Sequence, residues 1–377
     1  MKAILFSQST KTTADLYPFT LTRKVQDIRI GINTIREKWE HLLAAQTIDK
    51  GGLITEPFYY ITANLLPSQK LATRVAQLKI GEALADADGN ILAALITGAH
   101  INNKTKKVNP EKTFAAGEAQ LIQYPWHIFE LNKIALAHDF EWLTKNRRSA
   151  PIDKSNFVSG KENIFIEKGA VVKHCFINAE EGPVYIGKNA LVMEGCCLRG
   201  PVSVGERAVV KMGAKIYGAT TIGPGCIAGG EIKNSVLFEN SNKAHDGYLG
   251  DSVIGAWCNL GAGTSNSNLK NTAGNIGVHL RSKKITAGVK CGVLMGDFSR
   301  TAINTSINTG TVIGVSANVF GTGFTPKHIP SFSWGFDTPV KYRLDKALAD
   351  AERWKALKGE ALTCTEKSIL KNIYKTT

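Results

Sequence analysis

The chain has 377 residues, too many for one ordinary hydrophobic core, so two domains and a tail are expected. Basic residues exceed acidic residues by 46 − 32 = 14, and this charge favours anionic partners such as phosphorylated small molecules. The basic residues are dispersed, so we expect no binding of nucleic acid. The apolar run 3–6 is too short for a signal peptide, and no segment approaches the ~20 apolar residues of a membrane span. We therefore expect a cytoplasmic protein that does not bind membranes.

The first 150 residues have the mixed pattern of an α/β domain. Apolar residues with helical spacing alternate with short, strand-like apolar runs, and the segment 146–151 is the predicted linker to the next domain. Strands are expected at 1–6, 58–62 and 91–97, and helices at 28–43, after the capping residue Ser68, and at 125–143.

An internal repeat follows the linker. Aliphatic residues recur at every sixth position, and the residue four places after each is small or β-branched, a spacing that neither an α-helix nor simple strand alternation produces. The aliphatic positions are Ile186, Val192, Leu198, Val204, Val210, Ile216 and Ile222. Three hexads make one triangular coil, so the repeat predicts a left-handed parallel β-helix over 151–325, with a break in register at 233–252.

The C-terminal residues 326–377 are predicted to form a helical tail. Thr338 and Pro339 have the residue types of an N-cap and a first helical position, and Gly359 is the expected stop. We expect the apolar stripe of this helix to pack against the β-helix.

The break at 233–252 contains a candidate catalytic base. A regular β-helix is structurally self-sufficient, so a departure from its period often marks a functional site. Acylation of an amine needs a group that accepts a proton near neutral pH, and imidazole has the matching pKa. His245 is therefore the candidate base, with a solvated or purely structural histidine as the alternative.

The residues around His245 resemble a known family. The sequence reads Glu231-Ile-Lys, Lys243-Ala-His, Tyr248-Leu-Gly-Asp and Asn259-Leu-Gly-Ala-Gly-Thr in this order. Over roughly residues 160–320 the chain resembles the acetyltransferase half of the bifunctional N-acetylglucosamine-1-phosphate uridyltransferase/glucosamine-1-phosphate N-acetyltransferase family.

This resemblance implies roles for individual residues. His245 corresponds to the family's catalytic base. The residues implied to bind the acceptor are Lys215, Lys233 and Tyr248, with Asn259 and Asn268. The resemblance also implies acetyl-CoA as cosubstrate, an amino-sugar phosphate similar to glucosamine 1-phosphate as acceptor, and a place in UDP-N-acetylglucosamine and cell-envelope precursor synthesis.

Two departures from the family pattern concern the acceptor. Leu269 follows Asn268 where the family has tyrosine, and Lys215 stands where the family has a phosphate-binding arginine. Lysine attracts a phosphate but does not clamp it in the bidentate way of arginine. The acceptor can therefore differ from glucosamine 1-phosphate.

The N-terminal half carries a second resemblance. The segment Asp15-Leu-Tyr-Pro-Phe-Thr resembles part of the nucleotidyltransferase half of the same family, which implies a truncated, Rossmann-like domain at 1–150. The preceding turn 7–13 contains no glycine, so backbone approach to a triphosphate is poorer, and Lys11, Arg23 and Lys24 are the remaining candidates for phosphate binding.

No metal site is predicted in this half. Asn64 lies about where a metal-binding aspartate is expected, and Asp86 and Asp88 fit a hairpin turn better than a magnesium pair. Mg²⁺ is therefore expected only if the domain is active, and we expect binding of a nucleotide or sugar phosphate without efficient nucleotidyl transfer.

Two functions other than acyl transfer are also compatible with the sequence. They are an active nucleotidyltransferase, which would make the protein bifunctional, and a non-catalytic scaffold. A zinc hydro-lyase on a β-helix needs a His-x4-His pair, which the eight histidines do not form, and the seven cysteines form no CxxC and are expected to be reduced.

Because a triangular prism offers flat faces, we expect a homotrimer with sites between neighbouring β-helices.

Overall fold

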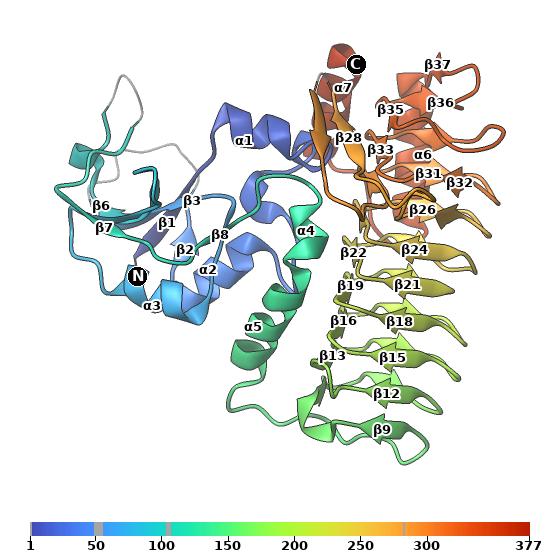
Figure 1. The fold of residues 1–377 in the computed structure, drawn as a ribbon, viewed down its shortest axis with the longest axis horizontal. Coiled ribbons are helices and arrows are strands. Elements are labelled where there is room, and N and C mark those ends of the chain that lie inside the picture. Colours follow the sequence, from blue (N-terminus) through green and yellow to red (C-terminus); the bar gives the residue numbers. More distant parts are fainter. Residues whose placement is uncertain (1, 49–55, 103–106, 282) are drawn as a thin grey trace. The chain divides into compact units, whose positions relative to one another are not determined.

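The computed structural model describes residues 2–48, 56–102, 107–281 and 283–377, which form two compact units (Figure 1). Unit 1 contains Met1–Asp15, Lys24–Arg29 and Asn33–Gln123, and unit 2 contains Leu16–Arg23, Ile30–Ile32 and Tyr124–Thr377. Unit 2 therefore includes two short segments from the first 32 residues. The domain boundaries 1–150, 151–325 and 326–377 stay predictions.

Unit 1 is an α/β unit around one mixed sheet, as predicted. The strand order is β2-β1-β3-β6-β5-β7, in which β1 is parallel to β2 and β3, β5 is parallel to β7, and β6 is antiparallel to β3 and β5. The strands are β1 (Ala3–Ser7), β2 (Gln46–Thr47), β3 (Phe58–Thr62), β5 (Glu82–Ala85), β6 (Ile91–Ile96) and β7 (Lys112–Ala115), with a separate pair β4 (Leu65–Leu66) and β8 (Gln120–Leu121).

Two of the predicted helices of unit 1 are present, one with a different start. Ser68 accepts a hydrogen bond from the Leu71 amide at 3.2 Å and caps α3 (Gln69–Ala76), as expected. The helix expected at 28–43 begins only at Ile35, because Thr34 and Glu37 form a capping box there and Ile28 is extended. The helix that begins at Ile35 is α2 (Ile35–Leu43), and the remaining helices and 3₁₀ turns of the N-terminal third are α1 (Thr10–Asp15), η1 (Phe19–Leu21), η2 (Val25–Asp27) and η3 (Gly98–His100).

Unit 2 is a parallel β-solenoid of about ten coils with three faces, preceded by two helices (Figure 1). The first face contains β10 (Ile164–Ile166), β13 (Val184–Ile186), β16 (Val202–Val204), β19 (Thr220–Ile222), β22 (Val236–Leu237), β25 (Val253–Ile254), β30 (Leu294–Met295), β33 (Val312–Ile313) and β35 (His328–Ile329). Left-handed winding of the coils stays a prediction from the hexapeptide pattern.

The second and third faces complete each coil. The second face contains β11 (Val171–Val172), β14 (Leu191–Val192), β17 (Val209–Val210), β20 (Ile227–Ala228), β23 (Asn242–Lys243), β26 (Asn259–Leu260), β31 (Arg300–Thr301), β34 (Asn318–Val319), β36 (Ser333–Trp334) and the antiparallel β37 (Val340–Lys341). The third face contains β9 (Phe157–Ser159), β12 (Phe176–Asn178), β15 (Cys197–Arg199), β18 (Lys215–Tyr217), β21 (Glu231–Lys233) and β24 (Tyr248–Gly250), and continues with β27 (Ser265–Asn266) and β32 (Ser306–Ile307); the turn η4 (Lys161–Asn163) precedes β10.

The predicted hexad core is confirmed. All seven aliphatic positions from Ile186 to Ile222 are buried, and Ile186, Val204 and Ile222 are register partners on the first face, one coil apart. These residues belong to one continuous core that runs through the coils. Inward packing therefore has the period that the sequence predicted.

The predicted break at 233–252 is wrong. These residues form a complete coil whose strands β22, β23 and β24 pair with the coil before. The coil is short, because the partners Ile222 and Leu237 are only 237 − 222 = 15 positions apart, which shifts the sequence period without interrupting the stack. The real insertion lies between the partners Ile254 and Met295, 295 − 254 = 41 positions apart, and contains the hairpin β28 (Gly277–Leu280) and β29 (Lys283–Thr286).

The two helices that precede the solenoid in the chain belong to unit 2. The helix expected at 125–143 is divided into α4 (His127–Glu130) and α5 (Asn132–Thr144), and α5 packs against β19. The buried amide of Asn132 accepts a hydrogen bond from the Gly31 amide and donates one to Thr221 Oγ1. Thr221 in turn donates to the Gly31 carbonyl, so this segment is hydrogen-bonded to the solenoid.

The C-terminal tail forms two helices, α6 (Leu344–Ala356) and α7 (Cys364–Thr376). The start expected at Thr338 and Pro339 is wrong, because the backbone just after them pairs as β37 with β36 and the helix begins only at Leu344. Gly359 has a φ of +74° just after α6, as expected for a helix stop.

Candidate functional site

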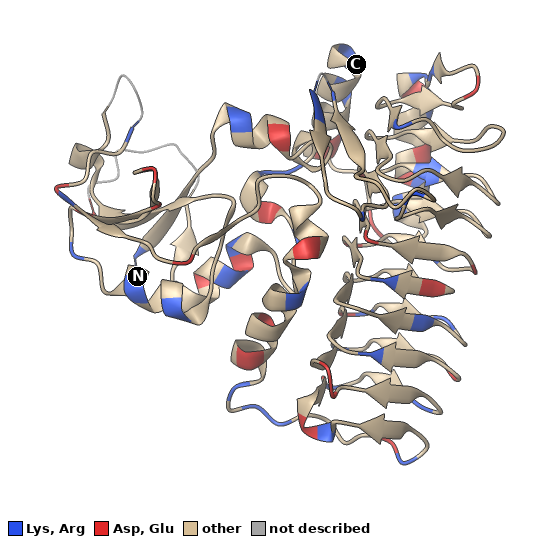
Figure 2. Cartoon of the chain, viewed as in Figure 1, with Lys and Arg blue, Asp and Glu red and all other residues tan. Residues whose placement is uncertain are grey.

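On the third face the outward side chains form two straight columns, because parallel register places equivalent residues side by side on neighbouring strands. One column contains Phe157, Phe176, Cys197, Lys215, Glu231 and Tyr248, and the other contains Ser159, Asn178, Arg199, Tyr217, Lys233 and Gly250. Figure 2 shows acidic and basic residues on the later strands of this face. The structure thus brings the predicted residues Lys215, Lys233 and Tyr248 onto the same three neighbouring strands.

Glu231 organises the centre of these strands. Its carboxylate accepts a 2.6 Å hydrogen bond from Tyr217 Oη, and this bond, together with burial, raises the pKa of Tyr217 to about 12. Lys233 Nζ lies 5.6 Å from the centroid of the Tyr217 ring, and Lys215 is the register neighbour of Glu231. Two lysines and one carboxylate on these neighbouring strands offer donors to an anionic group and an acceptor to a hydroxyl or ammonium group.

Tyr248 and Asn268 are in direct contact. The Asn268 amide donates a 3.1 Å hydrogen bond to Tyr248 Oη and a 2.5 Å bond to a carboxylate oxygen of Asp251, while the other oxygen of Asp251 accepts 2.6 Å from Asn234. Asp251 is buried, so these two amides replace its water. The sequence did not single out Asp251 or Asn234, although both have positive φ angles of 47° and 46° at equivalent corners of successive coils.

A second carboxylate lies near Asp251. Burial raises the pKa of Glu130 at the end of α4, and the negative charge of Asp251 raises it further. Burial and the same charge raise the pKa of the Cys291 thiol. The surroundings of Asn268 are therefore acidic as well as polar, a feature that residue order along the chain does not reveal.

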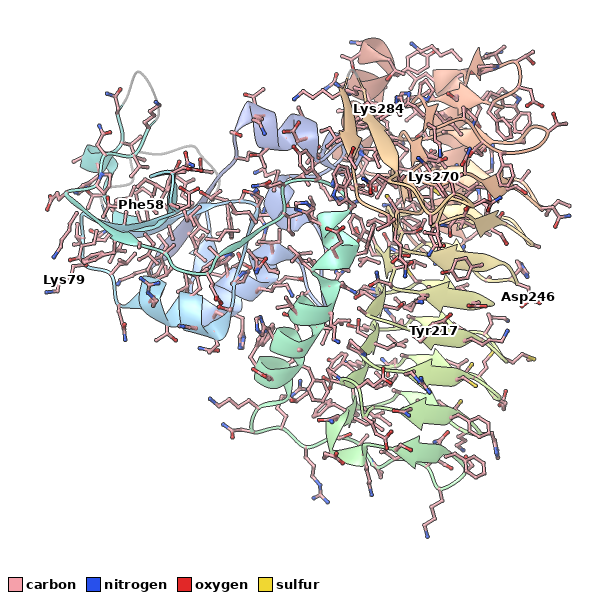
Figure 3. The ribbon with its side chains drawn as sticks, in the orientation of Figure 1. Phe58, Lys79, Tyr217, Asp246, Lys270 and Lys284 are labelled. Carbon is pink, nitrogen blue, oxygen red and sulfur yellow. The ribbon has the colours of Figure 1, made fainter. Side chains whose placement is uncertain are left out.

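His245 lies at the corner between the second and third faces, where the chain passes from β23 to β24. The residue is exposed, and Figure 3 labels its neighbour Asp246 at the same corner. The backbone carbonyl of His245 accepts a hydrogen bond from Lys243 Nζ, which also donates 3.2 Å to the Gly229 carbonyl on the coil before. The turn is thus fixed by a buried ammonium group while His245 is exposed, so its imidazole is accessible to a substrate.

The buried Lys243 has an altered basicity. Its side chain is almost fully buried, and this burial lowers the pKa of Lys243 to about 8, against the partly opposing charge of Asp246. Hydrogen bonds to the carbonyls of Gly229 and His245 hold the ammonium group in position. Sequence reasoning used Lys243 only as part of a motif and missed that it supports the His245 turn.

Asn259 does not lie with the other predicted residues. It is on β26 of the second face, where its side chain accepts a 3.4 Å hydrogen bond from Asn242 and where its register partner is Arg300. Lys358, just after α6, donates 3.1 Å to Asn242 from the tail. Within one chain, Asn259 and the column with Lys215 and Tyr248 therefore belong to different faces.

The three predicted phosphate-binding residues of the N-terminal half have different surroundings. Lys11 Nζ lies 2.8 Å from Asp15, one helical turn away in α1, and Lys24 is exposed before η2. Arg23 belongs to unit 2, where its side chain is only 10% exposed, is paired with Asp297 and lies 4.6 Å from the Phe238 ring. This pairing explains Arg23 as a structural residue better than as a phosphate ligand.

Over the described ranges, no three His, Cys, Asp or Glu side chains are grouped as a metal site, and the seven cysteines are free thiols. Asp86 accepts hydrogen bonds from the Asp88 and Asn90 amides at 3.0 and 2.8 Å and closes the turn between β5 and β6. In the described part of the chain, no helix has the length and apolar character needed to span a membrane.

Comparisons of sequence support the resemblance. Residues 3–148 match the profile of a family described as sugar nucleotidyl transferase. The chain is 39% identical over 84 residues to the bifunctional protein GlmU of Methanococcus maripaludis, which covers 22% of this chain and 20% of that protein. It is 40% identical over 91 residues to a bifunctional sugar-1-phosphate nucleotidylyltransferase/acetyltransferase of Sulfurisphaera tokodaii, covering 24% and 23%. The similarity to the bifunctional family is therefore confirmed, and the matches span about a fifth of these relatives' length.

Solved structures of two acyltransferases were also matched. A UDP-N-acetylglucosamine acyltransferase of Arabidopsis is 14% identical, with 59% of this chain and 88% of that chain covered and a TM-score of 0.23. A UDP-N-acetylglucosamine O-acyltransferase of Moraxella catarrhalis is 12% identical, with 58% and 96% covered and a TM-score of 0.24. Neither likeness bears on the reaction of this chain.

Proposed function

We propose that the solenoid is an acetyl-CoA-dependent N-acyltransferase whose acceptor is an amino-sugar phosphate similar to glucosamine 1-phosphate. The observation that carries this proposal is the exposed His245 on a fixed corner, directly before the strand that begins with Tyr248 and next to the face with Lys215 and Lys233. The sequence similarity to bifunctional sugar-1-phosphate nucleotidylyltransferase/acetyltransferases supports it. The reaction would supply an N-acetylated sugar phosphate for the synthesis of UDP-N-acetylglucosamine or a related cell-envelope precursor in the cytoplasm.

In the proposed reaction the amine nitrogen of the acceptor attacks the thioester carbonyl carbon. A C–N bond forms, the C–S bond breaks, and coenzyme A leaves as the thiol. His245 accepts the proton that the nitrogen loses and returns it to the departing sulfur, so that coenzyme A leaves as the thiol. Lys215 and Lys233 bind the phosphate through their ammonium charges, and Tyr248 and Asn268 bind sugar hydroxyls.

We also propose a homotrimer with sites between neighbouring β-helices. The role of Asn259 in acceptor binding stays a prediction, because its register partners Asn242 and Arg300 both contact the tail of the same chain. Light scattering at working concentration tests the proposal. A monomeric mass would contradict it.

For the N-terminal half we propose binding of a nucleotide or sugar phosphate, with Lys11 and Lys24 as phosphate contacts, and without efficient nucleotidyl transfer. The match of residues 3–148 to sugar nucleotidyl transferases favours active transfer as the second candidate function, with Mg²⁺ as its cofactor. Incubation with magnesium, UTP or dTTP and the matching sugar 1-phosphates separates the two. Robust pyrophosphate release would show that the glycine-free loop supports transfer.

The acyltransferase is tested by release of free thiol from acetyl-CoA in the presence of different amino-sugar phosphates. We expect release that depends on the acceptor and on His245. If no amino-sugar phosphate supports release and none raises the thermal midpoint of unfolding, the acyltransferase proposal fails and a solenoid that acts as a non-catalytic scaffold is favoured.

A further inference from the structure

A chain of side-chain hydrogen bonds runs along the edge of the third face where β21, β24 and β27 end. Asn234, Asp251 and Asn268 follow these three strands at equal intervals of 251 − 234 = 268 − 251 = 17 residues. Asn234 donates 2.6 Å to one oxygen of the Asp251 carboxylate, and Asn268 donates 2.5 Å to the other. Because Asp251 is buried and both of its oxygens are bonded, the carboxylate is a fixed acceptor that holds the Asn268 amide.

The carboxylate decides which way the Asn268 amide faces. A carboxylate only accepts hydrogen bonds, so the nitrogen of Asn268 must face Asp251. The second hydrogen of this nitrogen goes to Tyr248 Oη at 3.1 Å. Both amide hydrogens are therefore used, and in the described part of the chain no donor reaches the Asn268 carbonyl oxygen. The pair thus has an unused acceptor at Asn268 and, since Tyr248 Oη accepts, an unused hydrogen at Tyr248.

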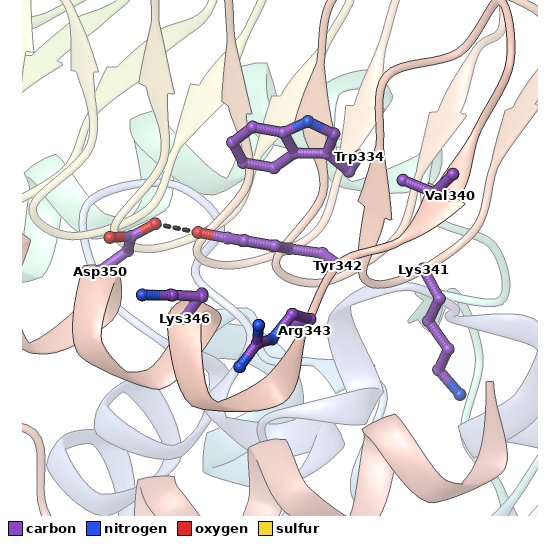
Figure 4. Close-up of a pocket in the computed structure, with 7 residues that line it drawn as sticks. All are labelled: Trp334, Val340, Lys341, Tyr342, Arg343, Lys346 and Asp350. Carbon is purple, nitrogen blue, oxygen red and sulfur yellow. Dashed lines mark hydrogen bonds between the residues drawn. The ribbon is translucent and has the colours of Figure 1, made fainter.

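Other tyrosines of unit 2 use their hydroxyl hydrogen within the chain. Tyr217 donates to Glu231, and Tyr342, which lines the cavity where the tail begins, donates to Asp350 (Figure 4). Within the described residues, the Tyr248 hydroxyl donates to no acceptor, and the residue is partly exposed. Burial and the nearby carboxylate charges raise the pKa of Tyr248, so the phenol keeps its hydrogen near neutral pH. This hydroxyl can therefore donate to a bound molecule.

Gly250 lets the Tyr248 ring reach this position. A Cβ atom on Gly250 would overlap the end of the Tyr248 ring, including Oη. The ring therefore lies over the glycine and extends toward Asn268, and a larger residue at position 250 would displace it. Gly250 and Asp251 thus fix the place and the hydrogen bonding of the pair from two sides.

We propose that Gly250 and Asp251 position Tyr248 and Asn268 to bind one hydroxyl of the acceptor. Tyr248 donates to the hydroxyl oxygen, and the carbonyl oxygen of Asn268 accepts the hydroxyl hydrogen. A hydroxyl both accepts and donates, whereas an ether oxygen only accepts and an ammonium group only donates. This inference rests on the proposed acyl transfer and extends it by naming the group that the pair selects.

The test compares acceptors that lack one hydroxyl. Thiol release from acetyl-CoA is measured with the amino-sugar phosphate that reacts fastest and with each of its monodeoxy analogues. In the wild type we expect kcat/KM to fall at least about tenfold for one analogue, because loss of the hydroxyl leaves two polar groups unpaired. Gly250→Ala and Asp251→Gly should lower this ratio to below about threefold, because Tyr248 is displaced or Asn268 is released.

The variants are chosen so that folding is retained. Gly250→Ala displaces only the free end of a side chain, so it should fold even if Asp251→Gly is unstable. Glycine adopts the positive φ of 47° at position 251 without strain. As controls, Gly274→Ala adds a methyl group where there is room, and Asn189→Gly changes another corner residue with a positive φ of 56°. Both controls should keep the wild-type ratio.

The inference is overturned if the wild type discriminates against no monodeoxy analogue, or if the folded Gly250 and Asp251 variants keep the wild-type ratio. A uniform loss of rate with an unchanged ratio would show that these two residues only support the fold. If the wild type releases no thiol with any amino-sugar phosphate, the acyl transfer itself is refuted, and this inference with it.

Discussion

The second and third faces of the solenoid are built by the same repeat and carry different outward residues. The second face begins with an aliphatic column of Val171, Leu191, Val209 and Ile227, and its later strands lie under the tail, where Arg300 is 5.1 Å from the Trp354 ring. The third face changes from stacked phenylalanines to the charged residues around Glu231. Inward residues are fixed by coil packing, whereas outward residues are free to become an interface on one face and a binding surface on the next.

The largest effect is expected at the corner between these two faces. His245→Ala should lower acetyl transfer by about 10²- to 10⁴-fold without loss of folding, because a general base is removed from an exposed turn. His174 is also exposed and lies at the equivalent corner between β11 and β12, so His174→Ala is the matched control. Comparable thiol release by the His245 variant and the wild type would rule out this base.

On the third face, Lys233→Ala should raise the KM for the amino-sugar phosphate about tenfold with little change in kcat, because a phosphate contact stabilises ground and transition states alike. Arg199 lies in the same column two strands away and is the control. Steady-state kinetics with varied acceptor concentration measure KM and kcat for both variants. An equal effect of Arg199→Ala would mean that the acceptor binds nearer to the start of the solenoid.

Lys243 links the two faces, and its ionisation predicts a pH dependence of stability. The folded-state pKa of about 8 lies below the ordinary value of 10.5, so between these values the folded protein releases a proton that the unfolded chain retains. The free energy of unfolding should therefore rise with pH across this window, by about 1–3 kcal/mol relative to Lys243→Met. Urea unfolding of both proteins at pH 7 and pH 10 measures this difference. The same pH dependence in the variant would assign the effect to other groups.

The smallest effect is expected at Cys197, the exposed register neighbour of Lys215 on the side away from Glu231. Cys197→Ser should change stability by less than about 0.5 kcal/mol and leave thiol release within a factor of about two. Thermal unfolding and the transfer assay check both. A clear loss of activity would extend the binding surface to β15.

The sequence was sufficient to predict the buried hexads, because every coil repeats the same inward packing. It did not predict that 233–252 forms a coil, since coils of 15 and 17 positions stack as well as coils of 18 but shift the period. The contact between Asp251 and Asn268 spans one such coil, so it can be found only when the coil length is known. Motif order does not state on which face of a coil a residue lies. The sequence therefore did not show that Asn259 lies on the second face while Lys215, Lys233 and Tyr248 lie on the third.

The pairing of Arg23 with Asp297 has a consequence for how such proteins can be recombined. Asp297 is buried and also accepts a 2.7 Å hydrogen bond from Thr22, so both partners come from the segment Leu16–Arg23. A gene fragment that begins at residue 124 would encode every coil but leave this carboxylate without its cation, at a cost of about 3–5 kcal/mol. Transfer of this solenoid into another protein by a single crossover would therefore carry a penalty that restoring residues 16–23 removes.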